Sequence, residues 1–144
     1  MDLHDIPYLS IARLGELIKS KEISSLEATE AYLERISRID GALNSYITVT
    51  YEEARQAAKK ADESIAQGHY HGPLHGIPVA VKDQFFTKGV RTTAGSNLSW
   101  EFIPEEDAVV VEKLNDAGAV LLGKLNLSEF ALGESFSHPG GTPR

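Results

Sequence analysis

Residues 77–82 read IPVAVK, a short run of apolar and β-branched side chains that ends in a lysine. Such a run predicts a buried strand, and a proline near its start is compatible with that structure. A second apolar run, AVLL at residues 119–122, predicts another buried strand. Between the two, residues 108–117 favour a helix that we expect Asp107 to cap and Gly118 to end. The order strand, long connection, helix, strand is typical of a parallel α/β sheet.

The first part of the chain favours helices. Ser10 precedes a short run with apolar residues at helical spacing. Ser24 and Glu27 form the S-x-x-E pattern of a capping box, which opens a second helix. We expect Gly41 to end that helix, because glycine adopts the left-handed conformation found after helices.

A strand and a third helix are expected to follow. Residues 45–50 are dominated by β-branched and aromatic side chains, which predict a short strand. Thr50 and Glu53 form a second capping-box pattern ahead of an alanine-rich helix over residues 51–67. A last short helix is expected from Ser128, and residues 137–144 are expected to form a loop.

The composition is that of a globular protein and excludes several classes of function. The 144 residues carry a formal charge of −7, which disfavours binding to nucleic acids and to anionic membranes. The absence of cysteine excludes disulfides, thiolate zinc sites and a cysteine nucleophile. The N-terminus is acidic and broken by Pro7, unlike a secretory signal, and no apolar run approaches the ~20 residues of a membrane span. We therefore expect a cytoplasmic protein.

Lys82 is the residue best placed for chemistry. At the carboxyl end of a strand, a side chain points into the crevice where α/β proteins bind ligands. Burial disfavours a charged ammonium, so a lysine in such a crevice can act as a neutral base that deprotonates a serine hydroxyl. The alternative is a lysine that extends from the strand end into solvent, paired with Asp83.

Three histidines suggest a weaker candidate site. His69, His71 and His75 could place two imidazoles on one side of an extended segment, as metal ligands require. The segment is rich in glycine and proline, however, and no carboxylate is interleaved with the histidines. We therefore expect a solvated loop here and no metal site.

Two further sets of polar residues have alternative interpretations. Ser96 lies in a polar turn and lacks the G-x-S-x-G pattern of a nucleophile elbow, so we expect it to shape the turn. Glu129 and Glu134 could form a pair of catalytic carboxylates, or simply the solvated side of a helix.

Several stretches, in order, resemble the amidase signature family. They are GPLHGIPVAVKD (72–83), TKGVRTTAGS (87–96), DA (107–108), AGAVLLGKLN (117–126), EFA (129–131) and GTPR (141–144). The resemblance covers nearly the whole chain and is most specific over residues 68–144, because several unrelated motifs occur there in the family's order.

The resemblance implies a fold, an activity and a site. The fold would be α/β: a helical N-terminal region (1–67) and the first strands of a mixed sheet flanked by helices (68–144). The activity would be hydrolysis of carboxamide C–N bonds through a Ser-cis-Ser-Lys triad and an acyl-enzyme. Lys82 would be the triad lysine, and Leu132 would contact the substrate. No metal or organic cofactor is implied, and the expected partners are a small-molecule amide and, in a homodimer, a second copy of the chain.

One departure from the family's pattern concerns the two triad serines. In the family they lie in a Gly/Ser-rich signature that should follow shortly after Arg144, and no residue here matches them. We therefore expect this chain to be the N-terminal piece of a longer single-domain amidase, and to be inactive alone. One alternative is the A subunit of a glutamyl-tRNA(Gln) amidotransferase, with B and C subunits as partners. Another is a non-catalytic fragment that acts only in assembly.

Overall fold

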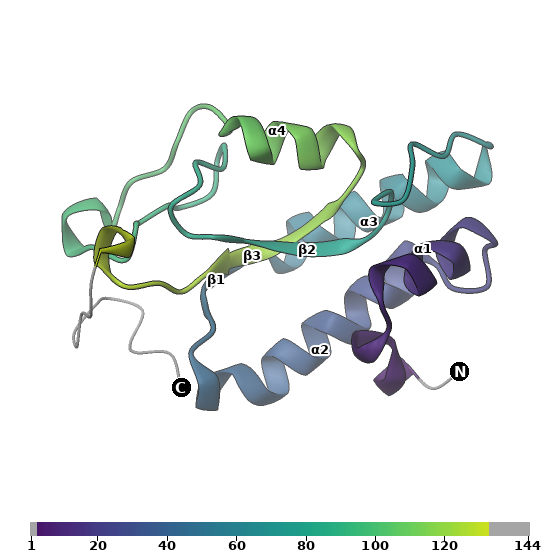
Figure 1. Ribbon diagram of the computed structural model, residues 1–144, viewed down its shortest axis with the longest axis horizontal. Coiled ribbons are helices and arrows are strands. Elements are labelled where there is room, and N and C mark those ends of the chain that lie inside the picture. The colour runs from purple at the N-terminus through teal and green to yellow at the C-terminus, as the bar shows by residue number, and fades with distance from the viewer. Residues whose placement is uncertain (1–2, 133–144) are drawn as a thin grey trace.

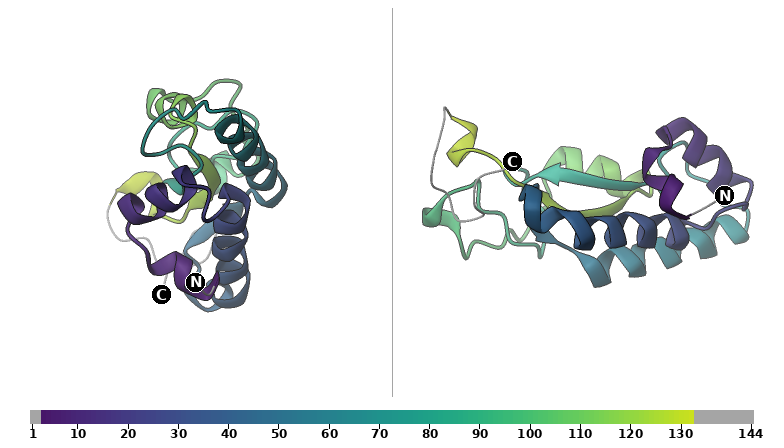
Figure 2. Two further views of the ribbon diagram at one scale, coloured as in Figure 1. Left: turned by 90° about the vertical axis from the view of Figure 1, so that its right-hand side faces the viewer. Right: turned by 90° about the horizontal axis from the view of Figure 1, so that it is seen from below.

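A small mixed sheet lies between helices in the computed structural model, which describes residues 3–132 (Figure 1). The strands are β1 (Tyr46–Val49), β2 (Pro78–Lys82) and β3 (Val120–Leu125). The helices are α1 (Ile11–Lys19), α2 (Ser25–Leu43), α3 (Tyr51–Ala66) and α4 (Val109–Asp116). Short 3-10 helices cover Leu3–Tyr8 (η1), Asn97–Ser99 (η2) and Glu129–Ala131 (η3). In Figures 1 and 2, α2 and α3 lie on one side of the sheet and α4 lies on the other.

The sheet has the order β1-β3-β2. β2 and β3 are parallel and are joined through α4, which confirms the strand–helix–strand prediction. β1 is antiparallel to β3, so the sheet is mixed, as the family resemblance implied. Because β2 and β3 run in the same direction, their carboxyl ends meet at one edge of the sheet.

The caps of the first two helices are as predicted. The Ser10 side chain accepts a hydrogen bond from the Arg13 N–H at the start of α1. Ser24 and Glu27 form a complete capping box at the start of α2, with each side chain accepting from the other residue's backbone N–H. These bonds also lower the pKa of the Glu27 carboxyl, chiefly through the Ser24 backbone N–H.

Two boundary predictions in this region are wrong. α2 continues past Gly41 to Leu43 and ends at Asn44, which takes the left-handed conformation (φ 54°) that was expected of the glycine. Thr50 makes no side-chain cap for α3. Its hydroxyl instead donates to the Leu121 carbonyl, because the adjoining β1 pairs with β3 and brings that carbonyl within reach.

Two buried clusters hold the helices on the sheet. The first joins η1, α1, α2, α3 and the residue before β2; its members are Ile6, Leu14, Leu17, Ile18, Ile23, Ala28, Ala31, Ile65 and Ile77. The second joins α2, α3 and β3; its members are Leu33, Ile36, Ala54, Ala58, Val120 and Leu122. The small alanines of α3 allow it to pack closely against α2, so the apolar spacing in the first half of the chain serves this common core.

The second half departs from prediction at two boundaries. Ala108, not Asp107, is the N-cap residue of α4. Asp107 instead accepts hydrogen bonds from the Lys88 N–H and the Asn115 side chain, and so ties the turn at residues 87–90 to this helix. β3 extends to Leu125, whereas the strand was expected to end at residue 122. At Gly123 (φ 152°) a Cβ atom would collide with the Thr48 carbonyl, so only glycine allows β1 to approach β3 here.

The loop before β2 is held by His75, which is buried and not solvated as expected. Its Nδ1 accepts a hydrogen bond from the His71 N–H (3.1 Å), and the two imidazole rings lie 4.4 Å apart. Gly118 (φ 77°) leaves the room that the ring occupies, because a Cβ there would collide with His75 Cδ2. Burial, and then the nearby His71, lower the pKa of His75, while Asp62 acts in the opposite direction.

We predict that His75 makes the fold less stable at acidic pH. Its pKa is lower in the folded state than in the unfolded chain, so its contribution to stability is complete above the unfolded pKa of about 6.5 and is lost as the pH falls from there through the folded pKa. Urea denaturation between pH 7.5 and 5 measures the free energy of unfolding as a function of pH. His75→Gln should flatten the pH dependence, and His69→Gln, at an exposed position, should leave it unchanged. Equal slopes for wild type and His75→Gln would contradict the prediction.

Candidate active site

Lys82 is the last residue of β2 and lies at the carboxyl edge shared with β3. It pairs with Leu125, and the ladder continues one residue further through the Asp83 N–H, which donates to the Leu125 carbonyl. The Lys82 side chain is half-buried. Within residues 3–132, no hydrogen bond or ion pair reaches its ammonium. The strand end therefore presents an amine that the described residues leave available.

Asp83 turns away from Lys82 and organises the following loop. Its Oδ2 accepts hydrogen bonds from the Thr93 N–H (2.9 Å) and the Thr93 hydroxyl (2.6 Å). Its backbone carbonyl accepts from the Ala94 N–H (2.9 Å). The carboxylate is fully buried. The idea that Asp83 pairs with Lys82 is therefore wrong, because this carboxylate accepts hydrogen bonds from Thr93 and forms its ion pair with another lysine.

That other lysine is Lys124, which sequence reasoning missed. It lies within β3, next to Val81 of β2, and its side chain is completely buried. Its ammonium donates to the Phe85 carbonyl (2.7 Å) and the Thr92 hydroxyl (2.6 Å), and lies 3.4 Å from Asp83 Oδ1. Burial lowers the pKa of Lys124, and the Asp83 carboxylate partly opposes this. A lysine inside the apolar run 121–125 was the signal that could have revealed it.

The loops around this network carry strained backbone. Ala94, Phe130 and Ala131 have positive φ angles of 51°, 50° and 58°. Such angles cost about 1–2 kcal/mol for residues other than glycine, and they gather at functional sites. The Phe130 N–H donates to the Ala94 carbonyl (2.7 Å), so the two strained segments are joined.

Ser96 has the turn role that was predicted. Its hydroxyl accepts from the Leu98 N–H and caps η2, and it donates to Glu129 Oε1 (2.6 Å). Glu129 is thus engaged in joining the two loops. Its proposed carboxylate partner, Glu134, lies outside the described residues.

The remaining candidates do not converge on Lys82. Leu132 lies two residues beyond Phe130, and its side chain is 77% exposed, so the described residues do not enclose it. Residues 3–132 contain no group of three or more metal-ligating side chains that could hold an ion. His71 and His75 contact each other and not a carboxylate, which gives them a packing role.

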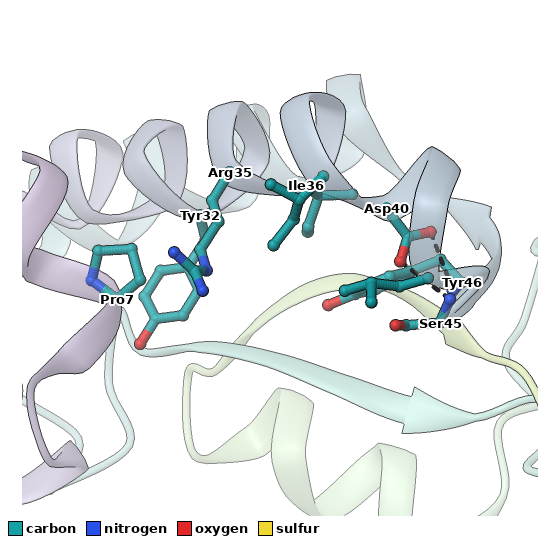
Figure 3. A pocket seen from close by; sticks show the side chains of 9 residues that line it. Pro7, Tyr32, Arg35, Ile36, Asp40, Ser45 and Tyr46 are labelled. Carbon is teal, nitrogen blue, oxygen red and sulfur yellow. Dashed lines mark hydrogen bonds between the residues drawn. The ribbon is translucent and has the colours of Figure 1, made fainter. Parts of the chain in front are cut away.

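A separate hollow of about 190 Å³ lies between η1, α2 and the start of β1 (Figure 3). Its charged residues are occupied: Asp40 accepts from the Ser45 and Tyr46 N–H groups, and Arg35 donates to the Tyr8 hydroxyl. Burial, aided by Asp40, raises the pKa of Tyr46 to about 12, so this phenol stays protonated. The hollow therefore offers packing and hydrogen bonds but no free acid, base or nucleophile among the described residues.

No helix within residues 3–132 is long and apolar enough to cross a membrane.

Sequence comparisons identify relatives that are much longer than this chain. It is 53% identical over 135 residues to the A subunit of a glutamyl-tRNA(Gln) amidotransferase from Geobacter metallireducens, covering 94% of this chain and 27% of the relative. It is 47% identical over 131 residues to the protein of the same name from Moorella thermoacetica, covering 91% of this chain and 27% of the relative. The chain thus spans about a quarter of the length of these relatives.

Solved structures give a consistent result. The native peptide amidase of Stenotrophomonas maltophilia superposes with a TM-score of 0.82 at 38% identity, over 87% of this chain and 26% of that one. A fatty acid amide hydrolase superposes with a TM-score of 0.82 at 28% identity, over 87% of this chain and 22% of that one. The sequence profile described as Amidase matches residues 27–143. The chain therefore belongs to the amidase family.

Proposed function

We propose that the full-length protein containing this chain hydrolyses carboxamide C–N bonds through a Ser-cis-Ser-Lys triad, with Lys82 as the triad lysine. The observation that carries the proposal is the contrast between two lysines at one sheet edge. The Lys124 side chain is completely buried and its ammonium contacts three oxygens, whereas the Lys82 amine is half-buried and has no partner within residues 3–132. A general base needs such an available amine.

The chemistry would follow from that position. In its neutral form, the Lys82 amine takes the proton of the bridging serine hydroxyl, and that serine in turn takes the proton of the nucleophilic serine. The nucleophilic oxygen attacks the amide carbonyl, and backbone N–H groups stabilise the resulting oxyanion. The amine leaves with a proton returned along the same relay, and water then attacks the acyl-enzyme and releases the acid. We place both serines in the family's Gly/Ser-rich segment, C-terminal to the residues described here.

Leu132 fits this proposal as a residue that contacts the acyl group. Its exposed side chain follows the strained turn at Phe130 and Ala131, which is bonded to the loop that begins at Asp83. An apolar side chain at such a place would favour apolar acyl groups over charged ones.

We predict that Lys82→Met and Lys82→Arg in the full-length protein both lower kcat by about 10²- to 10⁴-fold, because neither side chain can accept the serine proton. The assay measures ammonia release from a panel containing propionamide, benzamide and L-glutamine. The arginine variant separates catalysis from charge: if Lys82 serves only as a surface cation, arginine will replace it. Lys113→Met, an exposed lysine on α4, is the matched control and should keep wild-type turnover. Wild-type kcat in either Lys82 variant would refute the assignment.

Purified residues 1–144 are predicted to release no ammonia from the same panel, because no residue of the chain matches either triad serine. The outer edges of β1 and β2 have no partner strand within residues 3–132, so we also expect this piece to self-associate. Light scattering across a range of concentrations measures the association. Serine-dependent turnover by the piece, or a cooperative monomeric melt, would contradict these expectations. Association without turnover is also what the assembly-only alternative predicts, and the Lys82 variants separate the two.

The second candidate function is that of an amidotransferase A subunit, in which ammonia, once released, is passed on to a charged tRNA. The specific observation in its favour is sequence identity: relatives bearing that name reach 53%, whereas the peptide amidase structure reaches 38%. The test is co-expression of the full-length protein with B and C subunits from the same genome. Co-purification and glutamine-dependent amidation of Glu-tRNA(Gln) are expected for the amidotransferase. A protein that purifies alone and turns over simple amides would favour the hydrolase.

A further inference from the structure

The buried ammonium of Lys124 holds the segment that directly follows Lys82. It contacts residues 83, 85 and 92: a carboxylate, a backbone carbonyl and a hydroxyl. The carboxylate belongs to Asp83, the immediate neighbour of Lys82, and the carbonyl belongs to Phe85, two residues further on. One side chain from β3 therefore fixes the path by which the backbone leaves β2.

The contacts of Lys124 exclude it as a base. Two of its three N–H donors are used in hydrogen bonds to the Phe85 carbonyl and the Thr92 hydroxyl, and the ammonium also forms an ion pair with Asp83 Oδ1 at 3.4 Å. The side chain is also inaccessible, with no exposed surface. A substrate or a serine hydroxyl could reach it only if the loop opened. Whatever Lys124 contributes to turnover must therefore act through the residues it holds.

The partners of Lys124 are themselves constrained. Thr92 donates its hydroxyl proton to the Val90 carbonyl (3.1 Å), so its oxygen is left to accept from the ammonium. The other Asp83 oxygen is taken by Thr93, whose hydroxyl in turn accepts from the Gly95 N–H (3.0 Å). A shift of the ammonium would therefore displace the loop on both sides, at residues 83–85 and at residues 92–95.

We propose that Lys124 is a positioning residue: by holding Asp83, Phe85 and Thr92, it fixes the strand end from which Lys82 acts, a role that rests on the proposed function. General-base catalysis depends on sub-ångström placement, and a displacement of about 1 Å can lower a rate by about 10²-fold. The competing explanation is that Lys124 only stabilises the fold by neutralising Asp83. The two explanations differ in what happens when both charges are removed together.

The experiment compares variants of the full-length protein. Lys124→Met alone leaves the Asp83 carboxylate buried without its counter-ion and should lower stability. Asp83→Asn combined with Lys124→Met removes both charges and should raise the melting temperature above that of Lys124→Met alone, because no uncompensated buried charge remains. Lys113→Met repeats the same side-chain exchange at an exposed site as a control. Each protein is assayed for kcat and KM on the carboxamide that the wild-type enzyme turns over fastest.

If Lys124 positions Lys82, the folded double variant keeps a KM near wild type but loses kcat by about 10-fold or more, since the hold on Phe85 and Thr92 is gone. Wild-type kcat in the folded double variant would overturn the proposal. If the double variant does not fold, Thr92→Val decides, because it keeps both charges and removes one acceptor: reduced kcat at unchanged KM supports positioning, and wild-type kcat refutes it. Lys82→Met in the same series tests the proposed function separately. If Lys82 is not the catalytic base, Lys82→Met keeps wild-type kcat whatever the Lys124 variants do.

Discussion

The buried ion pair between Lys124 and Asp83 fixes the segment that leaves β2 at the carboxyl edge of the sheet. Removing two charges from water costs several kcal/mol for each, and close attraction offsets that cost only when the remaining donors and acceptors are also satisfied. Lys124 donates to Phe85 and Thr92, and Asp83 Oδ2 accepts from Thr93, whereas Asp83 Oδ1 has only the ion pair with Lys124. These contacts anchor the loop between β2 and η2 at residues 83–85 and at residues 92–93.

This constraint depends on the sheet topology. Parallel pairing of β2 with β3 places Lys124 beside Val81, one residue before Lys82, and so within reach of Asp83. β3 is the central strand and pairs with β1 on its other edge, and the loop after β2 supplies the oxygens that surround the lysine. Gly123 makes the pairing with β1 possible, since a Cβ atom there would collide with the Thr48 carbonyl.

Local patterns predicted the elements whose stabilising contacts are local. The Ser24–Glu27 box acts within three residues and formed as expected. The apolar run at residues 77–82 predicted the strand β2, although only Val81 of that strand is fully buried and its pairing partner β3 is distant in sequence. The predictions that proved wrong concern residues whose contacts are distant in sequence. Thr50 bonds Leu121 and Asp107 bonds Lys88, so neither side chain serves the cap that its local pattern suggested. Likewise, no periodicity could show that His75 is buried against Gly118, because that contact exists only once the chain has folded.

In the candidate site, too, local sequence indicated one feature, and contacts distant in sequence determined another. The position of Lys82 at a strand end could be predicted from the apolar run before it, and the family resemblance pointed to the same residue. The sequence signal for Lys124, a lysine inside an apolar run, did not distinguish a buried lysine from one in a solvated turn, because a lysine after a glycine at a strand end fits both. Only the three oxygens around its ammonium separate it from Lys82. Two lysines on neighbouring strands thus acquire opposite properties from their surroundings: Lys124 is completely buried among three oxygens, and Lys82 is half-buried with an amine that has no partner within residues 3–132.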